Sequence, residues 1–101
     1  MSDRALLWGF AEANISAFRA GELPLPSLVS RLEGVVAEAE QGGIDGTEAL
    51  VDSWESLEIC NAVILDRMEG LRWVGLWRWR AKRAVAHFEQ VARGVLGSSS
   101  Q

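Results

Sequence analysis

A chain of 101 residues that is 49% hydrophobic has the size and composition of one domain with a single packed core, which excludes a disordered protein. The single cysteine, Cys60, excludes an internal disulfide, and no Cys/His spacing suggests a zinc site. The net charge of -4 divides unevenly, because residues 1–70 sum to -9 and residues 71–101 sum to +5. This asymmetry indicates neighbouring helices of complementary charge, which we favour, or two faces of opposite sign that bind partners.

The first helix is expected at residues 3–20, with Ser2 as its N-cap and Gly21 as its stop. Charges at Asp3, Arg4 and Glu12 interrupt this segment, so it lacks the continuous apolar region of a signal peptide. No other stretch approaches the roughly 20 apolar residues of a membrane span, and we expect a cytoplasmic protein. The expected core face of this helix is Leu6, Leu7, Phe10, Ala13, Ala17 and Phe18.

The second helix is expected at residues 27–41, because Pro24 and Pro26 prevent the first helix from continuing and form a stiff connector. Gly42 and Gly43 end it. Apolar residues recur along it at helical spacing: Leu28, Leu32, Val35, Val36 and Ala39.

The third helix is expected at residues 47–69, with Thr47 as N-cap and Gly70 as C-cap. The fourth begins between Leu71 and Gly75 and ends near Leu96. Both have an apolar seam with alternating steps of four and three residues. The seams are Leu50, Trp54, Leu57, Asn61, Ile64 and Met68 in the third helix, and Trp77, Ala81, Ala84, Phe88, Val91 and Val95 in the fourth.

The loops between these helices are short, which favours antiparallel neighbours. The sequence therefore predicts an all-α, up-down-up-down four-helix bundle of one domain, residues 1–97, followed by a disordered tail at residues 98–101. A three-helix core with a loose first or second helix is the alternative.

Residues that carry catalysis or bind metals are sparse. His87, the single histidine, lies beside the Phe88 face without a nucleophile or acid at relay spacing, and we expect it to face solvent or to be satisfied locally. Cys60 is expected to be a small packing residue. We therefore expect no enzymatic activity, no cofactor and no metal.

Two polar residues of the third helix need partners. Asn61 falls within the apolar seam, where the indole of Trp54 or Trp73 or a backbone group could satisfy its buried amide, and we expect it to specify the packing register. Glu58 at the edge of the seam is expected to pair with a basic residue of the fourth helix.

The back of the third helix carries the β-branched pair Ile59 and Val63. A solvated face does not need these residues, so either this helix is buried on two sides or the pair is an apolar patch inside an acidic rim. An apolar anchor with a charged rim is the anatomy of a recognition surface. The candidate partner-binding residues are Asp52, Glu55, Ile59, Val63 and Asp66.

The fourth helix offers an alternative partner-binding surface. Trp73 and Trp77 fit its core face, but Trp79 projects among cations, as in stacking on nucleic acid, contact with a membrane surface or a protein interface. We favour the simpler interpretation that Trp79 packs under the first helix or a loop with an arginine stacked on it. The residues of this surface are Arg78, Trp79, Arg80, Lys82 and Arg83.

A family resemblance covers residues 10–67, in a layout of short helix, Gly turn, helix and Trp-x-x-Leu-Glu helix. It rests on the segments FRAGEL (18–23), LVSRLE (28–33), WESLE (54–58), NAV (61–63) and LDR (65–67). In these the chain resembles small α-helical bacterial immunity proteins of the colicin-D-like and contact-dependent growth inhibition type. Residues 71–101 have no counterpart in that family.

This resemblance implies a cytoplasmic protein that binds and neutralises a cognate bacterial toxin, often a nuclease that cleaves RNA. Such a toxin is commonly basic, and an acidic inhibitor can mimic the phosphate field that attracts it. The runner-up is a helical adaptor or homodimeric structural protein that uses the Trp79 surface. A nucleic-acid or membrane-surface binder that uses the fourth helix comes third. The nucleic-acid role is weakened because the pI is near 4.9, so one short basic segment must work against the repulsion of an acidic body.

Overall fold

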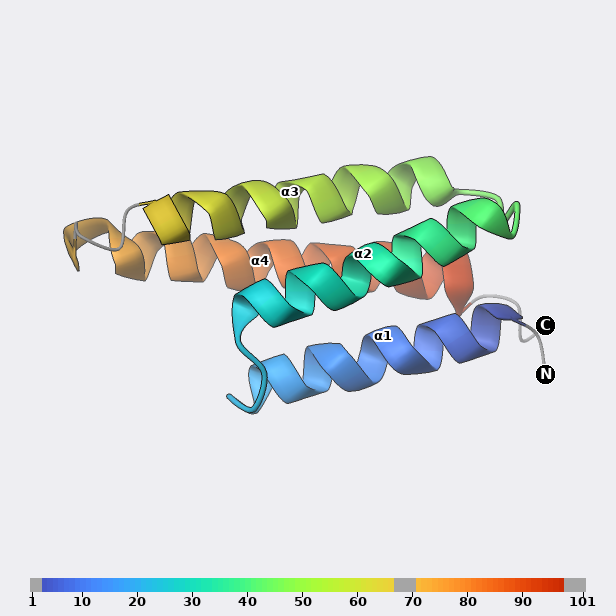
Figure 1. Cartoon of the computed structure of the whole chain (residues 1–101), viewed down its shortest axis with the longest axis horizontal. Coiled ribbons are helices and arrows are strands. Elements are labelled where there is room, and N and C mark those ends of the chain that lie inside the picture. Colours follow the sequence, from blue (N-terminus) through green and yellow to red (C-terminus); the bar gives the residue numbers. More distant parts are fainter. Residues whose placement is uncertain (1–2, 67–70, 98–101) are drawn as a thin grey trace.

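Four helices make up the described part of the chain in this computed structural model: α1 (Asp3–Arg19), α2 (Leu25–Gln41), α3 (Thr47–Asp66) and α4 (Leu71–Leu96) (Figure 1). The structure describes residues 3–66 and 71–97, with side chains for residues 4–63 and 78–97. The predictions for Ser2, Met68, Glu69, Gly70 and the tail at 98–101, and for the side chains of Ile64, Asp66, Trp73 and Trp77, lie outside this description.

The helices form the predicted up-down-up-down bundle. Each packs against its neighbour in sequence, and α1 also packs against α4, which closes the ring. The contact between α3 and α4 is the most extensive, and their joined ends project beyond α1 and α2 (Figure 1). The first turn of α1 and the last turn of α4 lie together at the opposite end. Because both α1 and α2 pack into the bundle, the alternative with a three-helix core is wrong.

No helix in the described part of the chain is long and apolar enough to cross a membrane.

The core lies on the bundle axis and draws on all four helices. The predicted apolar face of α2 is confirmed, since each of its five residues is buried. In α3 and α4 the buried face is centred slightly to one side of the predicted seam, so that Ser53 and Cys60 of α3 and Val85 of α4 are buried. The large residues that are fully buried are Ile15, Leu28, Leu32, Leu50, Leu57, Phe88 and Leu96.

The predicted core face of α1 is wrong for half of its residues. Leu6 and Phe10 are 57% and 48% exposed, whereas Ala11 and Ile15, which were not predicted, are completely buried. Trp8 also packs against the core from a half-buried position. α1 has apolar residues around most of its circumference, so periodicity alone does not select the side that meets α2 and α4.

Two glycines end helices through the same arrangement. Gly21 and Gly43 adopt the left-handed conformation, with φ of 79° and 66°. After α1 the backbone N–H of Glu22 donates to the carbonyl of Ala17, and after α2 that of Ile44 donates to Ala39. Each of these hydrogen bonds joins the first and the sixth residue of a segment and defines a Schellman motif, which satisfies the last carbonyl groups of the helix.

The start of α2 corrects a prediction. The helix begins at Leu25, two residues before the expected Ser27, and Pro24 is its N-cap. Pro26 is therefore inside the first helical turn. A proline is accepted there because the first backbone N–H groups of a helix have no partner within the helix.

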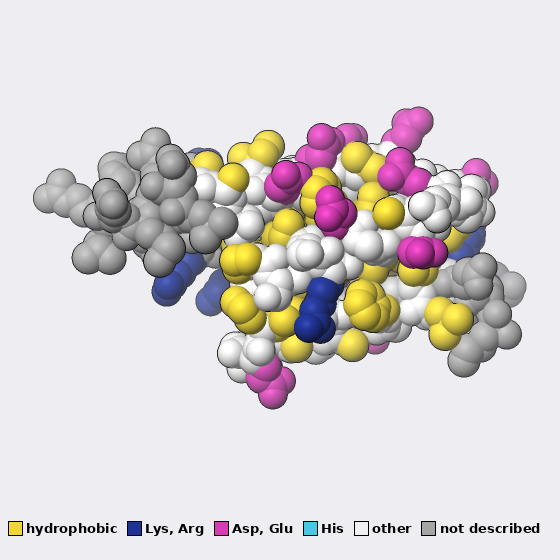
Figure 2. Space-filling model, viewed as in Figure 1, with side chains coloured by type: hydrophobic (Ala, Val, Ile, Leu, Met, Phe, Trp, Pro, Cys, Tyr) yellow, Lys and Arg dark blue, Asp and Glu magenta, His cyan; other side chains and the backbone are white. Residues whose placement is uncertain are grey.

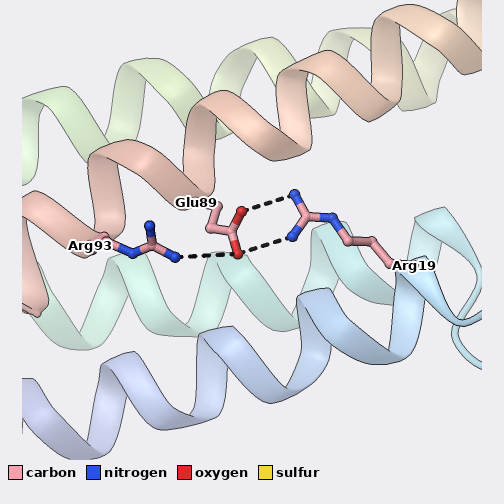
Figure 3. Close-up of polar contacts among 3 residues, drawn as sticks. All are labelled: Arg19, Glu89 and Arg93. Atoms are coloured by element: carbon pink, nitrogen blue, oxygen red, sulfur yellow. Dashed lines mark hydrogen bonds and ion pairs between the residues drawn. The ribbon is translucent and has the colours of Figure 1, made fainter.

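Polar contacts fasten the helices to one another. The Arg19 guanidinium of α1 contacts both carboxylate oxygens of Glu89 of α4, at 2.9 and 3.0 Å (Figure 3). Arg93 approaches the same carboxylate from the next turn of α4, at 3.9 Å. The Trp54 indole Nε1 of α3 donates to the Val29 carbonyl of α2 at 2.9 Å.

Candidate functional site

The outward side of α3 carries one of the two candidate surfaces, which we call the acidic face: Asp52, Glu55, Ile59, Val63 and Asp66. At 100° per residue these positions fall within about 80° of the helix circumference, away from the buried Leu50 and Leu57. The helix therefore brings all five positions to one side, as the sequence predicted.

Ile59 is the centre of the acidic face. Its side chain is 61% exposed, and the carboxylate-bearing residues Asp52 and Glu55 are exposed on its N-terminal side. Val63 is half-buried, so it offers a partner less contact area than Ile59 does. The Asp66 side chain lies outside the described residues. Of the two interpretations left open, the exposure of Ile59 supports an apolar patch and excludes burial of this residue on a second side of the helix.

A further acid was missed by the sequence analysis as part of this face. Glu48 is exposed one turn before Asp52 and falls within the same arc of α3. The i, i+4 spacing from Asp52 was the available signal. With Glu48 the described acidic residues of this face extend along about two turns of α3.

The charge of this region is not neutralised by internal ion pairs with described side chains. The ion pairs observed between described side chains centre on Glu89 of α4, which faces Arg19 of α1 (Figure 3). Figure 2 shows acidic side chains gathered over both α2 and α3, where Glu33 and Glu40 of α2 are exposed too. The acidic face is thus part of a broader negative surface.

The second candidate surface, the basic face of α4, is also exposed. Trp79 is 54% exposed, and the Arg83 guanidinium carbon lies 4.9 Å from the centre of its ring. The interpretation that Trp79 packs under the first helix or a loop is wrong, although the expected arginine stacking is present. The five residues Arg78, Trp79, Arg80, Lys82 and Arg83 are all exposed.

A groove of about 780 Å³ lies beside this basic face, between the α1–α2 turn and α4. Phe18, Leu25 and Val85 give it an apolar floor, and Arg78 and Lys82 place two cations on its α4 side. It has the size of a small-molecule pocket, and Arg78 and Lys82, which line it, also belong to the alternative partner-binding surface.

The residues considered for catalysis show no reactive arrangement. His87 is exposed, and Cys60 is buried. Burial raises the pKa of the Cys60 thiol above its ordinary value of 9.0, against a smaller opposite effect of the nearby Arg80 charge. The thiol is therefore protonated at neutral pH and a poor nucleophile. No cluster of three His, Cys, Asp or Glu side chains occurs within the described residues.

The structure tests part of the pairings predicted for Asn61 and Glu58. The Trp54 indole donates to the backbone of α2 and so does not serve Asn61, and the Trp73 side chain lies outside the described residues. Asn61 is half-buried, and its buried Oδ1 atom has no hydrogen-bond partner among the described residues. Glu58 is exposed, and no ion pair joins it to a described side chain of α4. Neither residue is placed to contact Ile59 on the outward side of α3.

In the described part of the chain the structure is an all-α four-helix bundle that presents an acidic face on α3 and a basic face on α4. Comparison with known proteins yields no match to a family model, to a curated protein or to a solved structure.

Proposed function

We propose that the protein binds another protein of basic charge through the acidic face of α3. The observation that carries this proposal is the 61% exposure of Ile59, a β-branched apolar residue, beside the exposed carboxylates of Asp52 and Glu55. An exposed apolar centre gives affinity when it is covered, and the surrounding charges attract and orient the partner.

More specifically, we propose that the chain is an immunity protein, and that the partner it neutralises is a cognate bacterial toxin, a basic nuclease. The resemblance in residues 10–67 and the negative surface over α2 and α3 both support this form. An inhibitor of this kind needs a stable small scaffold and no chemistry of its own, so the proposal includes that the protein is not an enzyme. It acts in the cytoplasm, where the toxin would otherwise reach its substrate.

The test combines toxicity with binding kinetics. The product of the neighbouring gene is expressed alone and together with the protein, and its inhibition of growth is measured. We expect the wild type to restore growth. In stopped-flow experiments at two salt concentrations, D52K/E55K should slow association and weaken its salt dependence, whereas Ile59→Ala should mainly speed dissociation, by about tenfold.

The matched control is E12K/E22K, which changes the net charge equally at exposed positions away from α3. It should slow association far less than D52K/E55K. Equal effects of the two double variants would refute the acidic face as the binding site. A neighbouring gene product that is neither toxic nor bound would refute the immunity form alone.

The basic face of α4 supports a second candidate function, that of a helical adaptor. Trp79 is large, half exposed and stacked by Arg83, as in the aromatic and arginine anchors of many interfaces. Loss of partner binding in Trp79→Ala, with binding retained in D52K/E55K, would favour this function. Binding of RNA or anionic vesicles that disappears with salt would instead favour the nucleic-acid or membrane-surface role.

A further inference from the structure

A third surface, on α1, is apolar and uncovered. Leu6, Phe10 and Ala13 are exposed and Ala17 is half-buried, and the four follow one another in steps of four, three and four residues. We call this row the α1 seam. Figure 2 shows apolar side chains on the face of the molecule formed by α1 and α2. The exposed side of a bundle helix is normally polar, so a seam of this kind points to a second helix that covers it.

The sizes of the seam residues are self-complementary. The two large residues, Leu6 and Phe10, occupy the first half of α1, and the two alanines occupy the second half. If a second copy lies antiparallel, with a two-fold axis level with the peptide between residues 11 and 12, Leu6 faces Ala17 of the second copy. In the same register Phe10 faces Ala13 of the second copy. Each large side chain then meets a small one, which is how facing helices interdigitate.

Charges on the adjoining edge of α2 fit the same register. The Arg31 guanidinium donates to Asn14 Oδ1 at 2.8 Å, so Arg31 is level with position 14 of α1. Glu38 lines a hollow with Leu6 and Leu7 and is level with position 7. The two-fold axis brings position 7 of the second copy to the level of position 16. Arg31 and Glu38 of the second copy are then about 3 Å apart along the helix axis, and the contact occurs twice.

We propose that the chain forms a symmetric antiparallel homodimer through the α1 seam and the Arg31–Glu38 edge of α2. Each of these helices has 17 residues and is about 25 Å long, so the two give a face of about 500 Å² in projection. This is less than the roughly 800 Å² per partner of a standard interface, so the dimer is weak and concentration-dependent. It leaves the acidic face of α3 uncovered and does not depend on the proposed function.

Sedimentation velocity of the full chain between about 10 µM and about 1 mM tests the dimer. The wild type should change from monomer to dimer across this range, and Phe10→Glu should remain monomeric throughout. Phe10 is half exposed and its backbone carbonyl, not its side chain, accepts the bond from Asn14, so the helical circular dichroism and melting temperature should stay within a few degrees. A wild-type protein that is still monomeric at 1 mM overturns the proposal, and the α1 seam would then be a surface for a different protein.

A swap of side chains tests the register. Phe10→Ala leaves two small residues opposed and Ala13→Phe opposes two large ones, so each should raise the dimer Kd about tenfold or more. The double variant F10A/A13F restores one large and one small residue at each contact and should return the Kd to within about threefold of the wild type. Failure of the double variant to recover refutes the antiparallel register.

Variants of the other two surfaces separate this dimer from the alternatives. Ile59→Glu and Trp79→Ala alter exposed residues of α3 and α4 and should leave the dimer Kd unchanged. A dimer that dissociates in Trp79→Ala and persists in Phe10→Glu would overturn the α1 seam and place self-association on the basic face.

Discussion

Glu89 shows how one carboxylate holds two helices together. It accepts hydrogen bonds from Arg19 of α1, and this contact lowers the pKa of the Glu89 carboxyl below its ordinary value of 4.5. Burial acts in the opposite direction and the charge of Arg93 adds to the lowering. A carboxyl with a lowered pKa in the folded state binds protons less readily than in the unfolded chain. Its stabilisation is complete above pH 4.5 and is lost as the pH falls through the lower, folded pKa.

We expect the Glu89→Gln variant to lose less unfolding free energy than the wild type between pH 5 and pH 3. The difference should be under about 1 kcal/mol, because the Arg19 side chain is 47% exposed and the pair is screened by solvent. Urea unfolding at several pH values measures it, with Glu12→Gln, an exposed carboxylate of α1, as the control that should behave like the wild type. Identical pH profiles for Glu89→Gln and the wild type would contradict the assigned role.

Single residues also show where sequence reasoning ends. The positions of Asp52, Glu55 and Ile59 on one side of α3 follow from helical geometry alone, and they were predicted. Whether Ile59 is covered depends on how many neighbours α3 has, which is a property of the tertiary structure. Trp79 is the reverse case, since a tryptophan is usually buried and only the packing of α4 shows that this one is exposed.

At the scale of the elements, the glycines that follow α1 and α2 made the ends of these helices predictable. The expected stops at Gly21 and Gly42-Gly43 are within two residues of the observed ends of α1 and α2. The start of α2 was less predictable, because the rule that proline ends a helix does not apply to the first turn. The faces of α2 were correct and those of α1 were not, since α2 has one apolar side and α1 has several.

Two glycines of similar exposure should respond oppositely to alanine. Gly34 lies within α2 with no atom near an added Cβ, so Gly34→Ala should raise the unfolding free energy by about 0.5–1 kcal/mol. Gly43 has a φ of 66°, which costs an L-residue about 1–2 kcal/mol, so Gly43→Ala should lower it by about that amount. Urea unfolding of both variants checks the pair, and a stabilising Gly43→Ala would exclude the left-handed helix end.

At the scale of the whole molecule, charge is arranged by face as well as by sequence. The acidic α3 and the basic α4 are neighbours, as the favoured interpretation of the charge asymmetry required. Asp52 and Glu55 of α3 and Arg78 and Arg83 of α4 are nonetheless exposed, so the second interpretation, two faces of opposite sign, also applies. The sequence shows that acidic and basic residues are unevenly distributed between the two parts of the chain. Which of these charges a partner meets depends on how each helix is rotated about its own axis. That rotation is set by the burial of residues such as Leu57 and Phe88.

The first turn of α1 and the last turn of α4 lie at the same end of the bundle, near the 42–46 turn, where Gly46 approaches Val95 of α4 (Figure 1). The chain can therefore be circularly permuted. A short flexible linker would join the two original ends, and the new termini would lie at Ile44 and Asp45. We expect this circular permutant to keep the helical circular dichroism spectrum and cooperative thermal unfolding of the wild type. The α3–α4 hairpin would then precede the α1–α2 hairpin, with both new ends far from the projecting tip of α3 and α4. Fluorescent proteins attached at those ends would report separation of the two hairpins, and a permutant that fails to fold would show that chain connectivity contributes more to this bundle than packing does.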